Sequence, residues 1–203
     1  ALRGGLVVFL EVTPVAGAGH YLLSAVLVWN AVVLHHKASH PESPRRPVAT
    51  PQLLFRSQAL VAVAIIVLAS GTLVTGSGPH GGDEAAHRLP FDVSGAARLH
   101  SLAVWVLLGL AIVVVRQLTR GDAAPTAIGR GNLLVAAIVA QGTLGYVQYF
   151  TGVPEPLVGL HVLGSVLVWV AALRLHLELA DGAPASPVDP SAESTPLTAP
   201  AAR

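Results

Sequence analysis

The 203-residue chain contains no cysteine and no methionine, and only 11% of its residues are charged. The absence of cysteine excludes a disulfide framework, thiol chemistry and zinc-finger patterns. Soluble domains carry about 25% charged residues. A charged fraction this low, beside 53% hydrophobic residues, therefore indicates a chain that mostly contacts lipid or other helices. The net charge of +1, without any basic block, argues against a nucleic-acid partner.

Several apolar stretches are long enough to cross a bilayer, whose hydrocarbon core is about 30 Å thick. Because backbone polar groups find no partners in lipid, apolar runs of this length are expected to be helices. The predicted fold class is therefore all-α, a polytopic membrane protein built as a helical bundle with about five spans. The expected spans are residues 15–34, 57–76, 99–115, 133–150 and 157–175.

Two parts of the chain resemble each other with a shift of 141 residues, which places His20 on His161. Each copy has a Pro-containing loop followed by His-x-Leu-x-Ser at the head of an apolar helix. A repeat at this spacing indicates tandem four-helix bundles. The chain begins with Ala1 inside the repeat unit, and residues 6–10 resemble the end of a further span. We therefore expect a longer protein, whose first two to three helices precede this chain.

The repeat and the composition together predict the organisation of the chain. We expect the tail to be disordered because it is rich in Pro, Ala and Ser and has no apolar period. The predicted parts are 1–36, the end of an N-terminal four-helix bundle; 37–56, a cytoplasmic linker; 57–178, a C-terminal four-helix bundle; and 179–203, a cytoplasmic tail.

Lys and Arg are distributed unevenly between the connections. Nine of the twelve lie after the first span, after the third span, or at the end of the fifth and beyond it. The positive-inside rule places these connections and the C-terminus in the cytoplasm. The first, third and fifth spans then enter a plasma membrane from its outer face.

Those three spans each carry a histidine close to the outer end, namely His20, His100 and His161. At 1.5 Å per residue, each lies roughly 7–9 Å along its helix. Ionisable residues inside a membrane are costly and usually mark a functional site. Haem iron takes one or two axial imidazoles carried by helices. The three histidines are thus candidate metal ligands. His100 and His161 form the natural pair, whereas His20 needs a partner outside this chain.

Other interpretations of the histidines stay open. Each could hydrogen-bond a neighbouring helix or reach the outer interface. Zinc is less favoured, because no carboxylate or cysteine accompanies the histidines at ligand spacing. The histidines near the cytoplasmic ends of the spans are interpreted as solvated residues beside anionic headgroups. They are His35, His36, His40 and His176.

The connection between the second and third spans, residues 71–98, is rich in Gly, Ser and Pro and is expected to be irregular. It is either a flexible extracellular loop or a lid over a cofactor. As a lid it would offer Arg88 or Arg98 to carboxylates, which arginine binds in a bidentate manner. Arg98 lies two residues before His100. His80 and His87 could contact a ligand, although loop histidines are more often simply exposed.

Four segments of the chain, which contain the three histidines and the first part of the connection 71–98, resemble one protein family. GTLVTGSGPHGGD, followed by RLHSLAVW around His100 and QGTLGYVQYFTGVPEPLVGLHVLGS around His161, is similar to the C-terminal half of haem A synthase of the actinobacterial type. RGGLVVFLEVTPVAGAGHYLLS, around His20, is similar to the end of that family's N-terminal half. The resemblance covers residues 3–178, and TGSGPHGGD together with the two His-bearing helices is its most specific part.

The resemblance implies a function for each histidine. His100 and His161 would be the axial ligands of a bound haem b in the C-terminal bundle. His20 would belong to the N-terminal site, where a methyl group of haem O is oxidised to a formyl group. The product, haem A, serves cytochrome c oxidase. The other histidine and the acidic residue of that site belong to helices outside this chain, so we expect the chain alone to be inactive.

The partners implied are the haem O substrate, the lipid bilayer, haem O synthase, cytochrome oxidase assembly factors, a quinone or other electron acceptor, and further copies of the same protein. Two other functions stay open. A membrane cytochrome b-type electron carrier uses the same bis-histidine bundles, and a haem-free scaffold or transporter would use histidines only to bridge helices.

Overall fold

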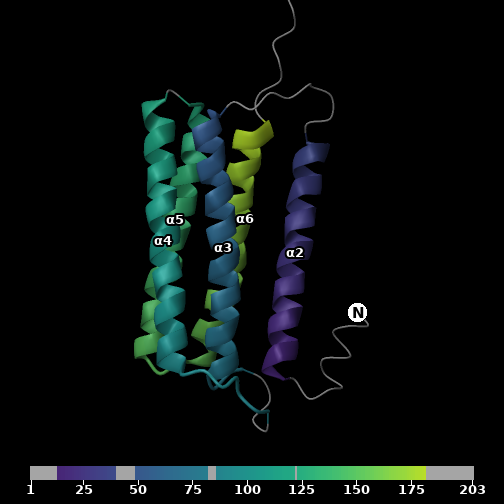
Figure 1. The fold of residues 1–203 in the computed structure, drawn as a ribbon, viewed down its shortest axis with the longest axis vertical. Coiled ribbons are helices and arrows are strands. Elements are labelled where there is room, and N and C mark those ends of the chain that lie inside the picture. Colours follow the sequence, from purple (N-terminus) through teal and green to yellow (C-terminus); the bar gives the residue numbers. More distant parts are fainter. Residues whose placement is uncertain (1–12, 40–48, 82–85, 122, 182–203) are drawn as a thin grey trace, which may run out of the picture.

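The computed structural model describes residues 13–39, 49–81, 86–121 and 123–181, and Figure 1 shows their arrangement. These residues form helices joined by short connections, and no strand occurs among them. Every helix is long and apolar enough to cross a membrane. The predicted all-α, multi-pass fold is therefore confirmed. The helices are α2 (Pro14–Ala38), α3 (Pro51–Ser77), α4 (Val93–Arg120), α5 (Pro125–Phe150) and α6 (Glu155–Asp181).

The last four of these helices form an antiparallel four-helix bundle. α3 packs on α4, α4 on α5, α5 on α6, and α6 on α3, while α2 packs against α3 and α6 from outside the bundle (Figure 1). α2, α4 and α6 begin at the same end of the molecule. The orientation predicted by the positive-inside rule would make this the outer end; the names outer end and cytoplasmic end are used below for the two ends on that basis. The predicted segment 6–10 lies outside the described residues, as do 40–48 of the linker and 182–203 of the tail.

The helices extend beyond the predicted apolar spans because their ends are capped. The Thr50 hydroxyl accepts a hydrogen bond from the amide of Leu53, and Pro51 occupies the first turn of α3. Thr13 and Pro14 begin α2 in the same way. Residues 51–56, predicted as linker, are therefore helical, and α6 continues past position 175 to Asp181.

The connection expected to be irregular from 71 to 98 is shorter than predicted. α3 continues to Ser77 and α4 begins at Val93. Gly71 and Gly76 lie inside α3 and are closely approached by other residues. A Cβ at Gly71 would lie 3.3 Å from Cε1 of His100, and a Cβ at Gly76 would lie 2.6 Å from Cδ1 of Leu89. Glycine in this stretch serves close packing rather than a turn.

The buried core lies mainly in one half of the bundle. In α4, α5 and α6 most buried residues lie in the half of the helix nearer the cytoplasmic end, with Ile138 and Gly164 as the exceptions. α3 also buries residues toward its outer end, among them Leu68 and Ser70. None of the residues 93–106 or 139–163 is buried. In these three helices burial is thus more extensive on the cytoplasmic side than on the outer side. The largest fully buried side chains are Leu60, Leu107, Leu118, Leu134, Leu173 and Leu175.

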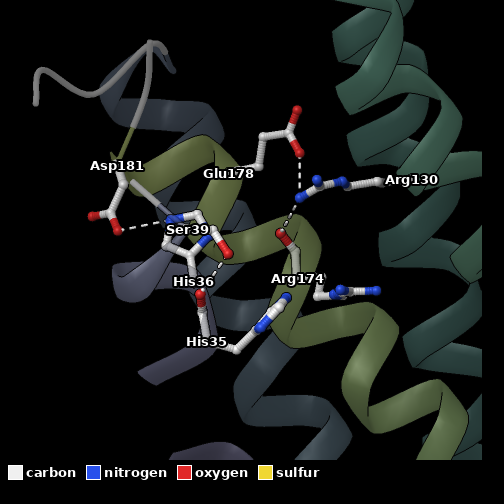
Figure 2. A network of polar contacts seen from close by, with 7 residues as sticks. All are labelled: His35, His36, Ser39, Arg130, Arg174, Glu178 and Asp181. Carbon is white, nitrogen blue, oxygen red and sulfur yellow. Dashed lines mark hydrogen bonds and ion pairs between the residues drawn. The ribbon is translucent and has the colours of Figure 1, made fainter. Parts of the chain in front are cut away.

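Polar contacts join the helices at the cytoplasmic end (Figure 2). Nε2 of His36 on α2 lies 3.0 Å from Oδ2 of Asp181 on α6, and the His36 side chain is only 14% exposed. Arg130 on α5 pairs with Glu178 on α6. Nδ1 of His176 lies 2.9 Å from Oγ of Ser57. The interpretation of His36 and His176 as solvated interfacial residues is therefore wrong, because each has an interhelical partner.

Candidate functional site

The outer half of the bundle brings His100 and His161 together. They lie on α4 and α6, seven residues after Val93 and six after Glu155. Their ring centroids are 6.4 Å apart, and the ring planes are inclined at 76°. These are the two residues that the sequence analysis paired.

Each of these imidazoles lies against a glycine of the preceding helix. A Cβ at Gly71 of α3 would lie 3.3 Å from Cε1 of His100. A Cβ at Gly145 of α5 would lie 3.1 Å from Cε1 of His161. The two hairpins, α3–α4 and α5–α6, therefore repeat one arrangement, in which a missing side chain makes space for an imidazole. This role of glycine was not predicted from the sequence, although the aligned repeat pairs Gly145 with a glycine, Gly4.

Hydrogen bonding differs between the two histidines. Nδ1 of His100 lies 3.1 Å from Oγ of Ser70, whose hydroxyl donates to the carbonyl of Val67 at 3.0 Å. Because the single hydroxyl proton is used, Ser70 accepts from Nδ1–H of His100 and leaves Nε2 as the free nitrogen. Nδ1 of His161 is buried without a hydrogen-bond partner among the described residues.

The pair fits a metal centre with two axial imidazoles. A metal lies about 2 Å from an imidazole nitrogen, and a centroid separation of 6.4 Å is compatible with an ion between the rings. No group of three or more His, Cys, Asp or Glu able to hold a metal occurs in the described part of the chain. The two side chains alone cannot complete a tetrahedral site, whereas haem iron needs only axial ligands from the protein. Around the pair, none of the residues 93–106 or 139–163 is buried.

His20 lies apart from this pair. It is exposed on α2 and lines a cavity of about 240 Å³, whose other walls include Leu68 of α3 and Val166 of α6. Beside the cavity the hydroxyl of Tyr21 lies 2.6 Å from that of Ser165. The structure therefore places His20 at the face of the bundle that α2 covers, and not with His100.

Asp92 fixes the start of α4, the helix that carries His100. Its carboxylate accepts a hydrogen bond from the Ser94 hydroxyl at 2.6 Å and from the Gly95 amide at 2.7 Å. These two bonds hold the pKa of the Asp92 carboxyl below its usual range. The N-cap therefore stays ionised at neutral pH and stabilises the first turn of α4.

The two arginines considered as carboxylate ligands differ in their surroundings. Arg98 is exposed on the first turns of α4. Arg88 donates from NH2 to the carbonyl of Pro79 at 2.8 Å, and its NH1 is buried without a partner among the described residues. Nε2 of His80 lies 2.8 Å from the carbonyl of Val153, which joins the two outer connections, and His87 is exposed. Arg88 is thus held more firmly at the outer end than Arg98.

Comparisons of the chain with protein-family models, with curated proteins and with solved structures found no match.

Proposed function

We propose that this chain is the later part of a haem A synthase, and that its four-helix bundle holds a haem b between His100 and His161. One observation carries the proposal: two imidazoles from non-adjacent helices lie 6.4 Å apart in the outer half of an apolar bundle. The order of motifs around these histidines, which resembles the family, is the second support. The protein would lie in the plasma membrane with its C-terminus in the cytoplasm.

The residues of the chain have distinct tasks in this proposal. His100 and His161 would be the axial ligands, and the bound haem would supply reversible one-electron chemistry. Ser70 would orient His100 by accepting its Nδ1–H, so that Nε2 faces the iron. Gly71 and Gly145 would admit the rings, and Arg98 or Arg88 would pair with propionates at the outer end.

His20 would act in the oxidation of haem O, beside the cavity between α2, α3 and α6. That site is formed together with residues of the N-terminal bundle. Electrons removed from the substrate would pass to a quinone or another acceptor. We expect the chain by itself to bind haem b and not to convert haem O.

The test is a reduced-minus-oxidised absorbance spectrum of the purified chain after haem supplementation, with chromatography of the extracted porphyrin. The expected result is a low-spin haem b spectrum. The full-length protein, supplied with haem O, is then expected to yield haem A. A colourless protein after supplementation would contradict the proposal.

A second outcome separates the nearest alternative. If the full-length protein holds haem b and leaves haem O unchanged, the bundle is that of a membrane cytochrome b-type electron carrier. The axial ligands would then be the same and only the reaction would differ.

A further inference from the structure

Three buried polar atoms in the outer halves of α5 and α6 have no hydrogen-bond partner among the described residues. They are Oε1 of Gln141, Oε1 of Gln148 and Nδ1 of His161. A buried polar atom without a partner costs about 1–3 kcal/mol in a protein, and lipid offers it no substitute. The two glutamines stand about one turn on either side of Gly145, the residue against which His161 lies. These atoms therefore belong to one part of the bundle and need an explanation.

Gln141 lies over Gly164 and not over His161. A Cβ at Gly164 would overlap the Gln141 carboxamide, so the glycine makes space for this side chain. Gly164 follows His161 by about one turn, toward the cytoplasmic end of α6. Gln141 is therefore directed away from the imidazole pair.

Gln148 is placed to reach His161. A side chain on a helix covers the turn that precedes its own Cα. Gln148 follows Gly145 by three residues, so its side chain covers the surface of α5 at Gly145, and there the ring of His161 lies with Cε1 3.1 Å from a Cβ built on that glycine. The free Oε1 is an acceptor, and Nδ1–H of a neutral histidine bound to metal through Nε2 is a donor.

We infer that Gln148 is a positioning residue for His161, accepting its Nδ1–H directly or through one water molecule while Nε2 binds the iron. The inference rests on the proposed haem site. Gln148 is then the counterpart of Ser70, which holds His100 in the other hairpin. An acceptor on Nδ1–H makes the imidazole a stronger donor to the metal and favours the oxidised iron. Gln148 is therefore expected to lower the midpoint potential of the haem.

The test compares three variants of the chain, purified with haem b: Gln148→Leu, Gln148→Glu and, as the matched control, Gln141→Leu. Gln148→Leu removes the acceptor and should raise the midpoint potential and alter the electron paramagnetic resonance signal of the oxidised haem. Gln148→Glu keeps an acceptor and adds negative charge, so it should shift the potential downward. Gln141→Leu makes the same chemical change about two turns away on α5 and should leave the midpoint potential and the electron paramagnetic resonance signal unchanged.

Opposite shifts in the two Gln148 variants support the inference, because a merely structural role would not reverse sign with the charge of the acceptor. An unchanged midpoint potential in both Gln148 variants overturns the inference. A shift in Gln141→Leu as large as that in Gln148→Leu also overturns it. In both cases the proposed haem site itself still stands. If Gln148→Leu fails to fold, the Gln148→Glu shift alone decides. A wild-type chain without haem b overturns the proposed function and this inference together.

Discussion

The two hairpins of the bundle present their histidines alike and hold them differently. In α3–α4 and in α5–α6, the second helix carries the histidine and the first offers a glycine to it. In the first hairpin Ser70, beside that glycine, also binds Nδ1 of His100. Leu144 stands at the equivalent place in the second hairpin and has no polar group to offer. The backbone arrangement is thus shared, while the hydrogen bonding around each imidazole is particular to its hairpin.

This difference separates two requirements of the site. Space for an imidazole depends on backbone approach, which glycine permits in both hairpins. Orientation of the imidazole depends on a polar partner, which can come from any neighbouring side chain. The proposed haem would therefore have one ligand oriented by a short serine and one oriented by a longer glutamine.

Removing either ligand is expected to have the largest effect. His100→Ala or His161→Ala should abolish the low-spin haem b spectrum, because each would remove one of the two proposed axial ligands. His176→Ala is the control, since His176 is also half-buried in α6 but binds Ser57 at the other end. Absorbance spectra of the three variants check this. A bis-histidine spectrum in His100→Ala or His161→Ala would contradict the ligand assignment.

Filling the space beside either imidazole should weaken haem binding without abolishing it. Gly145→Ala would place a methyl group 3.1 Å from Cε1 of His161, and Gly71→Ala would place one 3.3 Å from Cε1 of His100. A ligated ring cannot move aside, so we expect a cost of about 1–3 kcal/mol, which corresponds to a loss of affinity of about 5- to 150-fold. Titration of the protein with haem measures it.

Gly142→Ala is the control for these substitutions, because a Cβ at Gly142 would meet nothing within 4 Å. Equal affinities for all three variants would show that the close approach of glycine and imidazole has no effect on binding.

Removing the serine is expected to have the smallest effect. Ser70→Ala deletes one hydrogen bond, worth about 0.5–1.5 kcal/mol, and should leave haem bound while raising its midpoint potential. Ser57→Ala deletes a comparable bond to His176 and should not change the potential. Redox titration of both variants distinguishes a bond that tunes the haem from one that only joins helices. An unchanged potential in Ser70→Ala would remove Ser70 from the site.

The sequence predicted the helices better than their ends. All five spans are helical as expected, because apolar runs in lipid have no other way to satisfy their backbone. The start of α3 at Pro51 was missed, because its Thr50 cap lies outside the apolar run.

The end of α3 at Ser77 agrees with the expected span 57–76, but α4 begins at Val93, before the expected 99, because Asp92 caps it. The connection expected from 71 to 98 was too long, since Gly71 and Gly76 are typical of a loop in sequence and only their contacts show that they serve packing.

The candidate site was predicted in part. A similar depth for His100 and His161 was predicted because each lies a few residues after the start of its span and the two spans run in the same direction. Hydropathy and the distribution of Lys and Arg indicate that direction. The contacts of Ser70, Gly145 and Gln148 could not be foreseen, since each depends on how far a helix is rotated about its own axis. A helix that is apolar nearly all round carries no signal for that rotation.

By itself, the sequence determined that the chain is helical and long and apolar enough in each helix to cross a membrane, and it predicted three histidines at a similar depth. The tertiary structure alone decided that α2 packs outside the bundle against α3 and α6, so that His161 faces His100 and not His20. The physical reason is that hydrophobicity drives helices into lipid without choosing their neighbours. That choice depends on close packing at small residues and on polar contacts between helices, such as those of Ser70 with His100 and of His36 with Asp181.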